Sequence, residues 1–160
     1  ITMGDVPFVK AFTYLALLNR LEESSLVVLG FRPKFKKQYG VLETHGVQVS
    51  KITEWKYWSK YPEKKQQAFR ICNSGIYAAR RLDLLNYLSV LAARPHKVQK
   101  EINGKLTEVE EYFITDLVEY MHNDGLSVQF VVSENEEEVM GIDDFPALTN
   151  AQRIFKSQQF

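Results

Sequence analysis

Two aspartates stand at the ends of apolar segments, where a chain of strands and helices often carries chemistry. Asp5 follows an apolar opening and Gly4, and Asp143 follows Gly141-Ile142 near another predicted strand end. By themselves, these residue types favour a structural role, Asp5 in an Asx turn and Asp143 as a helix cap. Other reactive residues are sparse. No two of the three histidines have metal-ligand spacing, and the single Cys72 excludes an internal disulfide and a cysteine zinc site.

The elements that must position these aspartates alternate between strands and helices. Apolar residues at helical spacing predict helices at 13–23, 81–91, 113–122 and 147–156. Apolar or alternating runs predict strands at 25–31, 39–44, 47–54, 71–79 and 126–132, a buried strand at the very start, and a short strand or turn at 139–142. His45-Gly46 supplies a tight turn between 39–44 and 47–54, so these two form an antiparallel hairpin. The polar segment 95–110 is predicted as a long loop. The pattern indicates an α/β fold with a mixed sheet.

Length and composition narrow the class of protein further. The 160 residues fit one ordinary domain, with 45% hydrophobic and 25% charged residues. The formal net charge of zero argues against a dedicated nucleic-acid or membrane-surface module, which needs a basic excess. No apolar run is long enough to cross a bilayer. With one cysteine, a reducing, cytoplasmic location is the simplest expectation.

Six short motifs occur in one order along nearly the whole chain. They are Gly4-Asp5-Val6-Pro7, Tyr39-Gly40, Glu54-x-Lys56, Asn73-Ser74-Gly75-Ile76-Tyr77, Glu111-Tyr112-Phe113-Ile114-Thr115-Asp116 and Gly141-Ile142-Asp143-Asp144. Together they resemble the pyrophosphorylase domain of bacterial N-acetylglucosamine-1-phosphate uridyltransferase, the GlmU type, in the sugar-nucleotidyltransferase superfamily. The resemblance implies an incomplete Rossmann-like, GT-A-like nucleotidyltransferase domain, with a mixed sheet, flanking helices and an antiparallel hairpin.

The resemblance also implies a reaction and a metal. In that family a sugar-1-phosphate oxygen attacks the α-phosphorus of UTP, and pyrophosphate leaves. Two polyanions must meet, so a hard cation is expected, and Mg²⁺ takes one or two protein carboxylates with substrate phosphates. The family match makes Asp5 and Asp143 the Mg²⁺ ligands. The GlmU type usually has Asn at the second position and related nucleotidyltransferases have Asp, so another sugar-1-phosphate nucleotidyltransferase stays an alternative.

Four further residues match positions that hold the sugar in that family. Glu54 resembles the glutamate that accepts from sugar hydroxyls, and Asn73 resembles an asparagine on the same sugar, whose amide offers both donor and acceptor. Gly40 resembles a glycine that lets the backbone approach the acetamido group, and Thr115 a threonine that lines the pocket. The structural alternatives are an exposed pair with Lys56 for Glu54 and a β-bulge for Gly40.

The match lacks the family's Gly-rich nucleotide-binding loop, which lies near its N-terminus. We therefore expect residues 1–146 to be the sugar-binding half of a nucleotidyltransferase domain, and residues 147–160 a closing or linker helix. The complete enzyme would use UTP and N-acetylglucosamine-1-phosphate. The 160 residues alone would be inactive and would associate with the missing N-terminal half or with themselves, since exposed edges and apolar faces seek partners. The rival hypothesis is a non-catalytic interaction module with the same fold.

Overall fold

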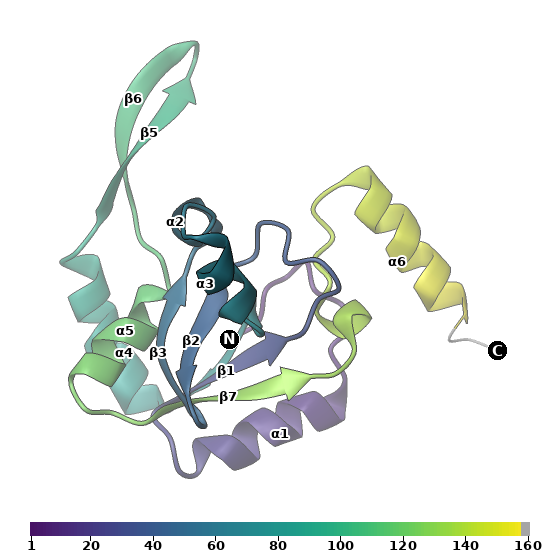
Figure 1. Cartoon of the computed structure of the whole chain (residues 1–160), viewed down its shortest axis with the longest axis horizontal. Coiled ribbons are helices and arrows are strands. Elements are labelled where there is room, and N and C mark those ends of the chain that lie inside the picture. Colours follow the sequence, from purple (N-terminus) through teal and green to yellow (C-terminus); the bar gives the residue numbers. More distant parts are fainter. Residues whose placement is uncertain (158–160) are drawn as a thin grey trace.

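A strongly curved mixed sheet with helices around it forms the body of the molecule (Figure 1). The computed structural model describes residues 1–157. The helices are α1 (Ala11–Leu21), α2 (Trp55–Trp58), α3 (Glu63–Ala68), α4 (Arg81–Ala92), α5 (Asp116–Asn123), the 3₁₀ helix η1 (Glu136–Val139) and α6 (Phe145–Ser157). The strands are β1 (Leu26–Phe31), β2 (Val41–His45), β3 (Gln48–Thr53), β4 (Cys72–Ala79), β5 (His96–Ile102), β6 (Lys105–Glu111) and β7 (Val128–Ser133). The predicted α/β class with a mixed sheet is confirmed.

The main sheet has the strand order β1-β4-β2-β3-β7 and closes on itself. β1 runs parallel to β7 and antiparallel to β4. The predicted hairpin of residues 39–54 is confirmed as β2 and β3, which pair from Val41–Thr53 to His45–Gln48. The sheet is closed by little pairing, because β3 and β7 pair only at Gln48–Gln129.

β1 is buried on both faces and divides the interior into two hydrophobic cores. Leu26 and Val28 face the core beneath α4 and α5, which contribute Leu91, Leu117, Val118 and Met121. Val27, Leu29 and Phe31 face the core covered by α1. The near-continuous apolar run at 25–31 is typical of such a doubly covered strand. Each large apolar side chain buried in this way contributes about 1.5–3 kcal/mol to the free energy of unfolding.

The predicted loop at 95–110 is wrong, because these residues form the antiparallel hairpin of β5 and β6. Asn103 and Gly104 both have positive φ, +52° and +74°, as the two-residue turn of a hairpin requires. The hairpin stands away from the body (Figure 1) and carries ion pairs Lys97–Glu108 and Lys100–Glu111 in place of an apolar face. Its strands are rich in lysine and glutamate and their few apolar residues do not alternate, so no apolar period marked them.

The predicted buried strand at the start of the chain is also wrong. Ile1 is 45% exposed, and the first ten residues form no regular strand. Ile1 nevertheless exchanges two backbone hydrogen bonds with Tyr77 of β4, at 2.8 and 3.0 Å. The opening therefore lies along the edge of β4, as an antiparallel neighbour would.

The C-terminal part of the chain ends in a helix, as expected. α6 begins at Phe145, two residues before the predicted start, and the predicted span 147–160 runs into residues 158–160, which lie outside the described part. The segment at 139–142 is irregular backbone after η1 and not a strand. Within residues 1–157, no helix combines the length and apolar character that crossing a bilayer needs.

Candidate functional site

A bulge in β4 decides where Asn73 lies. β1 and β4 pair at Leu29–Ile76 and next at Gly30–Asn73, so Ser74 and Gly75 are extra residues on β4. Gly75 has φ +80°, a conformation that glycine adopts without strain, and the Ser74 hydroxyl donates to the main-chain carbonyl of Leu29 at 2.7 Å. Such bulges redirect side chains at a strand end. Residues 73–75, the Asn-Ser-Gly motif, thus form the β-bulge that sets the backbone conformation where β4 meets β2.

The side chain of Asn73 is held by its own strand. Its Nδ2 donates to the Tyr77 hydroxyl at 2.8 Å, and its Oδ1 accepts from the main-chain N–H of Gly75 at 3.1 Å. Burial raises the pKa of the Tyr77 hydroxyl, and nearby Glu54 raises it further against the opposing effect of the Asn73 hydrogen bond. Tyr77 therefore stays protonated. An amide nitrogen carries two hydrogens, so one remains for a ligand.

Gly40 and Glu54 lie against each other and beside Asn73. Gly40 precedes β2 and Glu54 follows β3, and the pairing of Val41 with Thr53 sets them side by side. The main-chain N–H of Asn73 donates to the Gly40 carbonyl at 2.8 Å. A Cβ on residue 40 would lie 3.2 Å from Glu54 Oε2, closer than ordinary contact. Three residues predicted to hold a sugar, 33 positions apart in the chain at their widest, thus converge.

Thr115 joins this group through a shared pocket. An open pocket of about 480 Å³ is lined by Glu54 and Thr115, with Gln38, Trp55, Lys56 and the segment 111–114. Thr115 is 9% exposed and stands just before α5, with no side-chain cap of that helix. Glu54 belongs both to the Gly40–Asn73 group and to this pocket. Gly40 and Asn73 do not line this pocket, so the half-buried Glu54 is the residue that connects them with it.

Asp5 and Asp143 come from two segments in direct contact. The main-chain carbonyl of Asp5 accepts from the N–H of Ile142 at 2.9 Å. Asp5 Oδ2 lies 3.3 Å from where a Cβ on Gly141 would stand, so the glycine leaves room for the carboxylate. Both aspartates are exposed. Residues 1–157 contain no cluster of three or more His, Cys, Asp or Glu able to hold a metal ion. Two carboxylates fit Mg²⁺, which takes its remaining ligands from water and phosphate.

Tyr39 is the residue before Gly40 and has a half-buried side chain. Its main-chain carbonyl accepts from the Trp58 indole at 2.8 Å. Burial raises the pKa of the Tyr39 hydroxyl, and Glu136 and Asp143 raise it further, in that order. Asp144 has a different role, because its Oδ1 accepts from the main-chain N–H of Ala147 at the start of α6.

A buried carboxylate escaped the sequence analysis. The acidic segment 134–138 is typical of a solvated turn, but Glu138 is only 3% exposed. It accepts hydrogen bonds from the Thr13 hydroxyl, from the main-chain N–H of Lys10 at 2.9 Å and from the Ser133 hydroxyl at 2.9 Å. Glu138 ties the segment before Asp143 to the start of α1, which follows Asp5. Nothing in the local run of glutamates distinguishes this one.

The chain is similar in sequence to known proteins. The chain is 34% identical over 155 residues to the bifunctional protein GlmU of Novosphingobium aromaticivorans, covering 95% of this chain and 31% of that protein. It is 35% identical over 155 residues to the bifunctional protein GlmU of Sphingopyxis alaskensis, with the same coverage. The chain thus spans about a third of the length of these curated relatives. No family model matches the chain.

Solved structures share the fold at low sequence identity. A nucleoside-diphosphate-sugar pyrophosphorylase from Vibrio cholerae superposes with a TM-score of 0.59 and 17% identity, covering 84% of this chain and 49% of that one. The uridine diphosphate N-acetylglucosamine pyrophosphorylase of Trypanosoma brucei gives a TM-score of 0.55 and 12% identity, over 77% of this chain and 26% of that one. At such identities the likeness speaks for the fold alone.

Proposed function

We propose that this chain is the sugar-binding half of a sugar-1-phosphate nucleotidyltransferase domain, which forms UDP-N-acetylglucosamine and pyrophosphate from UTP and N-acetylglucosamine-1-phosphate. The observation that carries the proposal is the convergence of Gly40, Glu54 and Asn73 beside one pocket. Similarity to GlmU proteins over 95% of the chain supports it.

The sugar side of the reaction follows from the donors and acceptors of these residues. The Glu54 carboxylate accepts from sugar hydroxyls, and the free N–H of Asn73 Nδ2 donates to the same sugar. Because the Gly40 site has no room for a Cβ without pushing Glu54, a glycine there keeps the carboxylate in place and lets the ligand reach the main chain. Thr115, which lines the same pocket as Glu54, would add a hydroxyl.

The phosphate side rests on Asp5 and Asp143, which would hold Mg²⁺. When bound, the ion would neutralise the approaching sugar phosphate and UTP phosphates. The chain's own contribution is to keep the two carboxylates on segments joined by the Asp5–Ile142 hydrogen bond. In the reaction the sugar-1-phosphate oxygen forms a bond to the α-phosphorus while the bond to the β-phosphate breaks, so pyrophosphate leaves with the electron pair.

Exposed apolar surface supports the expected association with further protein. Phe12, Leu15 and Leu18 form a stripe on α1 and are each more than half exposed. Leu82, Leu85 and Leu88 form a second stripe on α4. Stripes of this kind mark surfaces that another segment or another copy covers. Light scattering on the isolated 160-residue chain tests this, because a stable monomer at high concentration would contradict it.

The reaction itself is tested by pyrophosphate release from the natural full-length protein. Mg²⁺ and UTP are supplied with N-acetylglucosamine-1-phosphate, glucose-1-phosphate or galactose-1-phosphate, and CTP replaces UTP in a second series. We expect the highest kcat/KM with UTP and N-acetylglucosamine-1-phosphate, and background rates for Asp5→Asn. Highest activity with another sugar or nucleotide would assign the protein a different substrate within the superfamily. No release with any pair would favour a non-catalytic module.

A further inference from the structure

A further pocket is lined by none of the residues predicted to bind the sugar or the metal. It has a volume of about 1020 Å³ and lies between the loop after β1 and the α3 region. Its lining comprises Arg32, Pro33, Lys34, Phe35, Lys36, Trp58, Glu63, Gln66, Gln67, Phe69 and Arg70. No residue lines both this pocket and the one beside Glu54. We call it the basic pocket.

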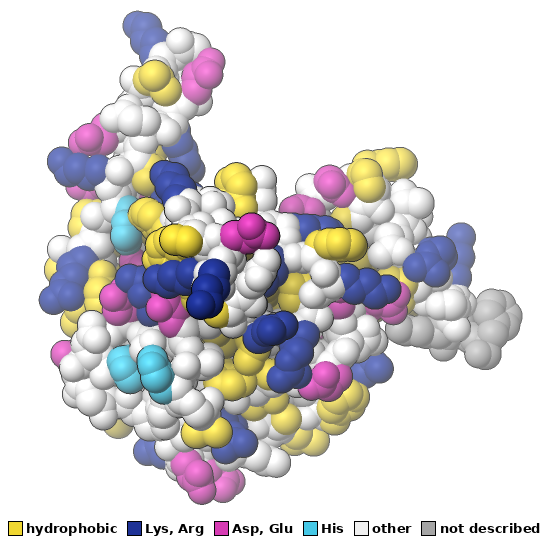
Figure 2. All heavy atoms as spheres, viewed as in Figure 1, with side chains coloured by type: hydrophobic (Ala, Val, Ile, Leu, Met, Phe, Trp, Pro, Cys, Tyr) yellow, Lys and Arg dark blue, Asp and Glu magenta, His cyan; other side chains and the backbone are white. Residues whose placement is uncertain are grey.

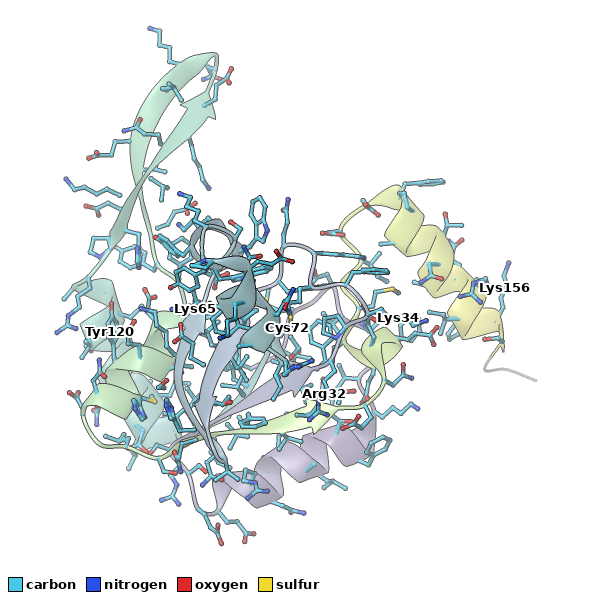
Figure 3. The ribbon with its side chains drawn as sticks, viewed as in Figure 1. Arg32, Lys34, Lys65, Cys72, Tyr120 and Lys156 are labelled. Atoms are coloured by element: carbon cyan, nitrogen blue, oxygen red, sulfur yellow. The ribbon has the colours of Figure 1, made fainter. Side chains whose placement is uncertain are left out.

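Its charge departs from that of the chain as a whole. The protein has a formal net charge of zero, yet four cationic side chains and one carboxylate, Glu63, line the basic pocket. Lys and Arg side chains gather on this part of the surface in Figure 2. In Figure 3 the labelled Arg32 and Lys34 extend from the loop that follows β1. Cations collected around a hollow repel one another and raise the local concentration of anions.

Nearby carboxylates offset only part of this charge. Arg32 pairs with Glu134 at 2.8 Å, outside the pocket, and Glu136 accepts from the main-chain N–H of Lys34. Among residues 1–157, neither the Lys34 ammonium nor the Arg70 guanidinium has a carboxylate within 4.0 Å. Both side chains are exposed and free to turn toward a ligand.

The Lys36 ammonium is held in position before any ligand binds. Its ammonium donates to the Gln66 main-chain carbonyl at 2.6 Å and stands 5.8 Å from the centre of the Trp58 ring. An ammonium has three hydrogens, so two remain for an anion. Because the contact joins the loop after β1 to α3, the two walls of the pocket are held together. Little ordering is then needed at this position when a ligand binds.

From this arrangement we infer that the basic pocket binds an anion carrying a diphosphate group. Lysine and arginine head groups from two walls match several phosphate oxygens at once, and arginine binds phosphate through two parallel hydrogen bonds. The volume is at the upper end for small-ligand pockets, so it accepts either free pyrophosphate or the diphosphate of a nucleotide. This site is separate from the proposed sugar site and goes beyond the proposed reaction.

The two tryptophans of the chain separate the two sites in one experiment. Trp58 lines the basic pocket and Trp55 lines the pocket beside Glu54. The natural full-length protein is labelled with 5-fluorotryptophan, and Trp55→Phe and Trp58→Phe each identify the ¹⁹F resonance of the residue that they remove. Titration with inorganic pyrophosphate should shift the Trp58 resonance saturably. An ADP titration in parallel identifies the source of the diphosphate, since the tighter binder of the two is the better match.

Variants decide whether the cations cause the binding. Lys34→Gln with Arg70→Gln should raise the dissociation constant read at Trp58 by about tenfold or more, because charge-assisted hydrogen bonds are lost. Lys64→Gln removes one positive charge from an exposed lysine of α3 that does not line the pocket, and should change the dissociation constant by about twofold at most. A Trp58 resonance that does not move at millimolar pyrophosphate overturns the inference, as does a double variant that binds like the unmodified protein. Loss of pyrophosphate release from UTP would leave this result unaffected.

Discussion

Replacing Glu138 tests how the two aspartate segments are held together. Glu138 accepts from two buried hydroxyls, those of Thr13 and Ser133, and from the main-chain N–H of Lys10. The hydroxyl-bearing residues are 3% and 5% exposed, so water cannot replace the carboxylate without rearrangement. Glu138→Ala leaves the Thr13 hydroxyl and the Lys10 N–H without their acceptor, whereas the Ser133 hydroxyl can still donate to the main-chain carbonyl of Asn135. Each such loss costs about 1–3 kcal/mol, so the free energy of unfolding should fall by roughly 2–6 kcal/mol.

Glu138→Gln separates the loss of charge from the loss of the acceptor. The amide oxygen still accepts from Lys10, and the hydroxyls of Thr13 and Ser133 can turn to accept from the amide nitrogen. Only the gain from a charged acceptor is lost, which is about 1–2 kcal/mol. The structure therefore predicts the order of stability Glu138, then Gln, then Ala. The same order is expected for turnover, since the contact joins the segments that carry Asp5 and Asp143.

Urea denaturation followed by tryptophan fluorescence measures this order, because Trp58 is buried and becomes exposed on unfolding. With a slope of about 2 kcal/mol per molar urea, Glu138→Ala should lower the midpoint by about 1–3 M. Glu137→Gln is the matched control, because Glu137 is the exposed neighbour and its side chain has no comparable contacts. The reasoning is refuted if Glu138→Ala is no less stable than Glu137→Gln.

Four further predictions concern the site and the core. Asp5→Asn and Asp143→Ala should each remove most pyrophosphate release at saturating Mg²⁺ while the circular dichroism spectrum stays unchanged; full turnover in either variant would remove the metal assignment. Glu54→Ala should raise the KM for the sugar phosphate about 5- to 150-fold, from the loss of about 1–3 kcal/mol, and leave the KM for UTP unchanged; the reverse pattern would mean that the two half-sites are confused. Gly40→Ala places a Cβ 3.2 Å from Glu54 Oε2, so it should raise the same KM by displacing the carboxylate, but less than Glu54→Ala does. Cys72 is fully buried and burial raises the pKa of its thiol to about 11, so at pH 8 a disulfide reagent should modify it in urea but not in the native protein, as read by peptide mass spectrometry.

Local patterns determined the identity of most elements before any packing was known. The doubly buried strand at 25–31, the hairpin at 39–54 and the amphipathic helix α1 follow from periods of two or 3.6 residues. The β5–β6 hairpin shows the limit of that signal. Its strands bury little and consist mainly of polar and charged residues, so the period that reports burial is absent.

The sequence by itself therefore determined most of the main-sheet strands and the long helices, the α/β class and the six motifs that resemble a nucleotidyltransferase. Only the tertiary structure decided which residues meet. Gly40, Glu54 and Asn73 converge because the register of β2 with β3 and a bulge in β4 place them together. Glu138 is buried, while the adjacent Glu137 is exposed, because α1 and β7 bring Thr13 and Ser133 to Glu138. Local sequence reports backbone preference and the burial of one face, whereas contacts across more than a hundred residues depend on how those faces pack.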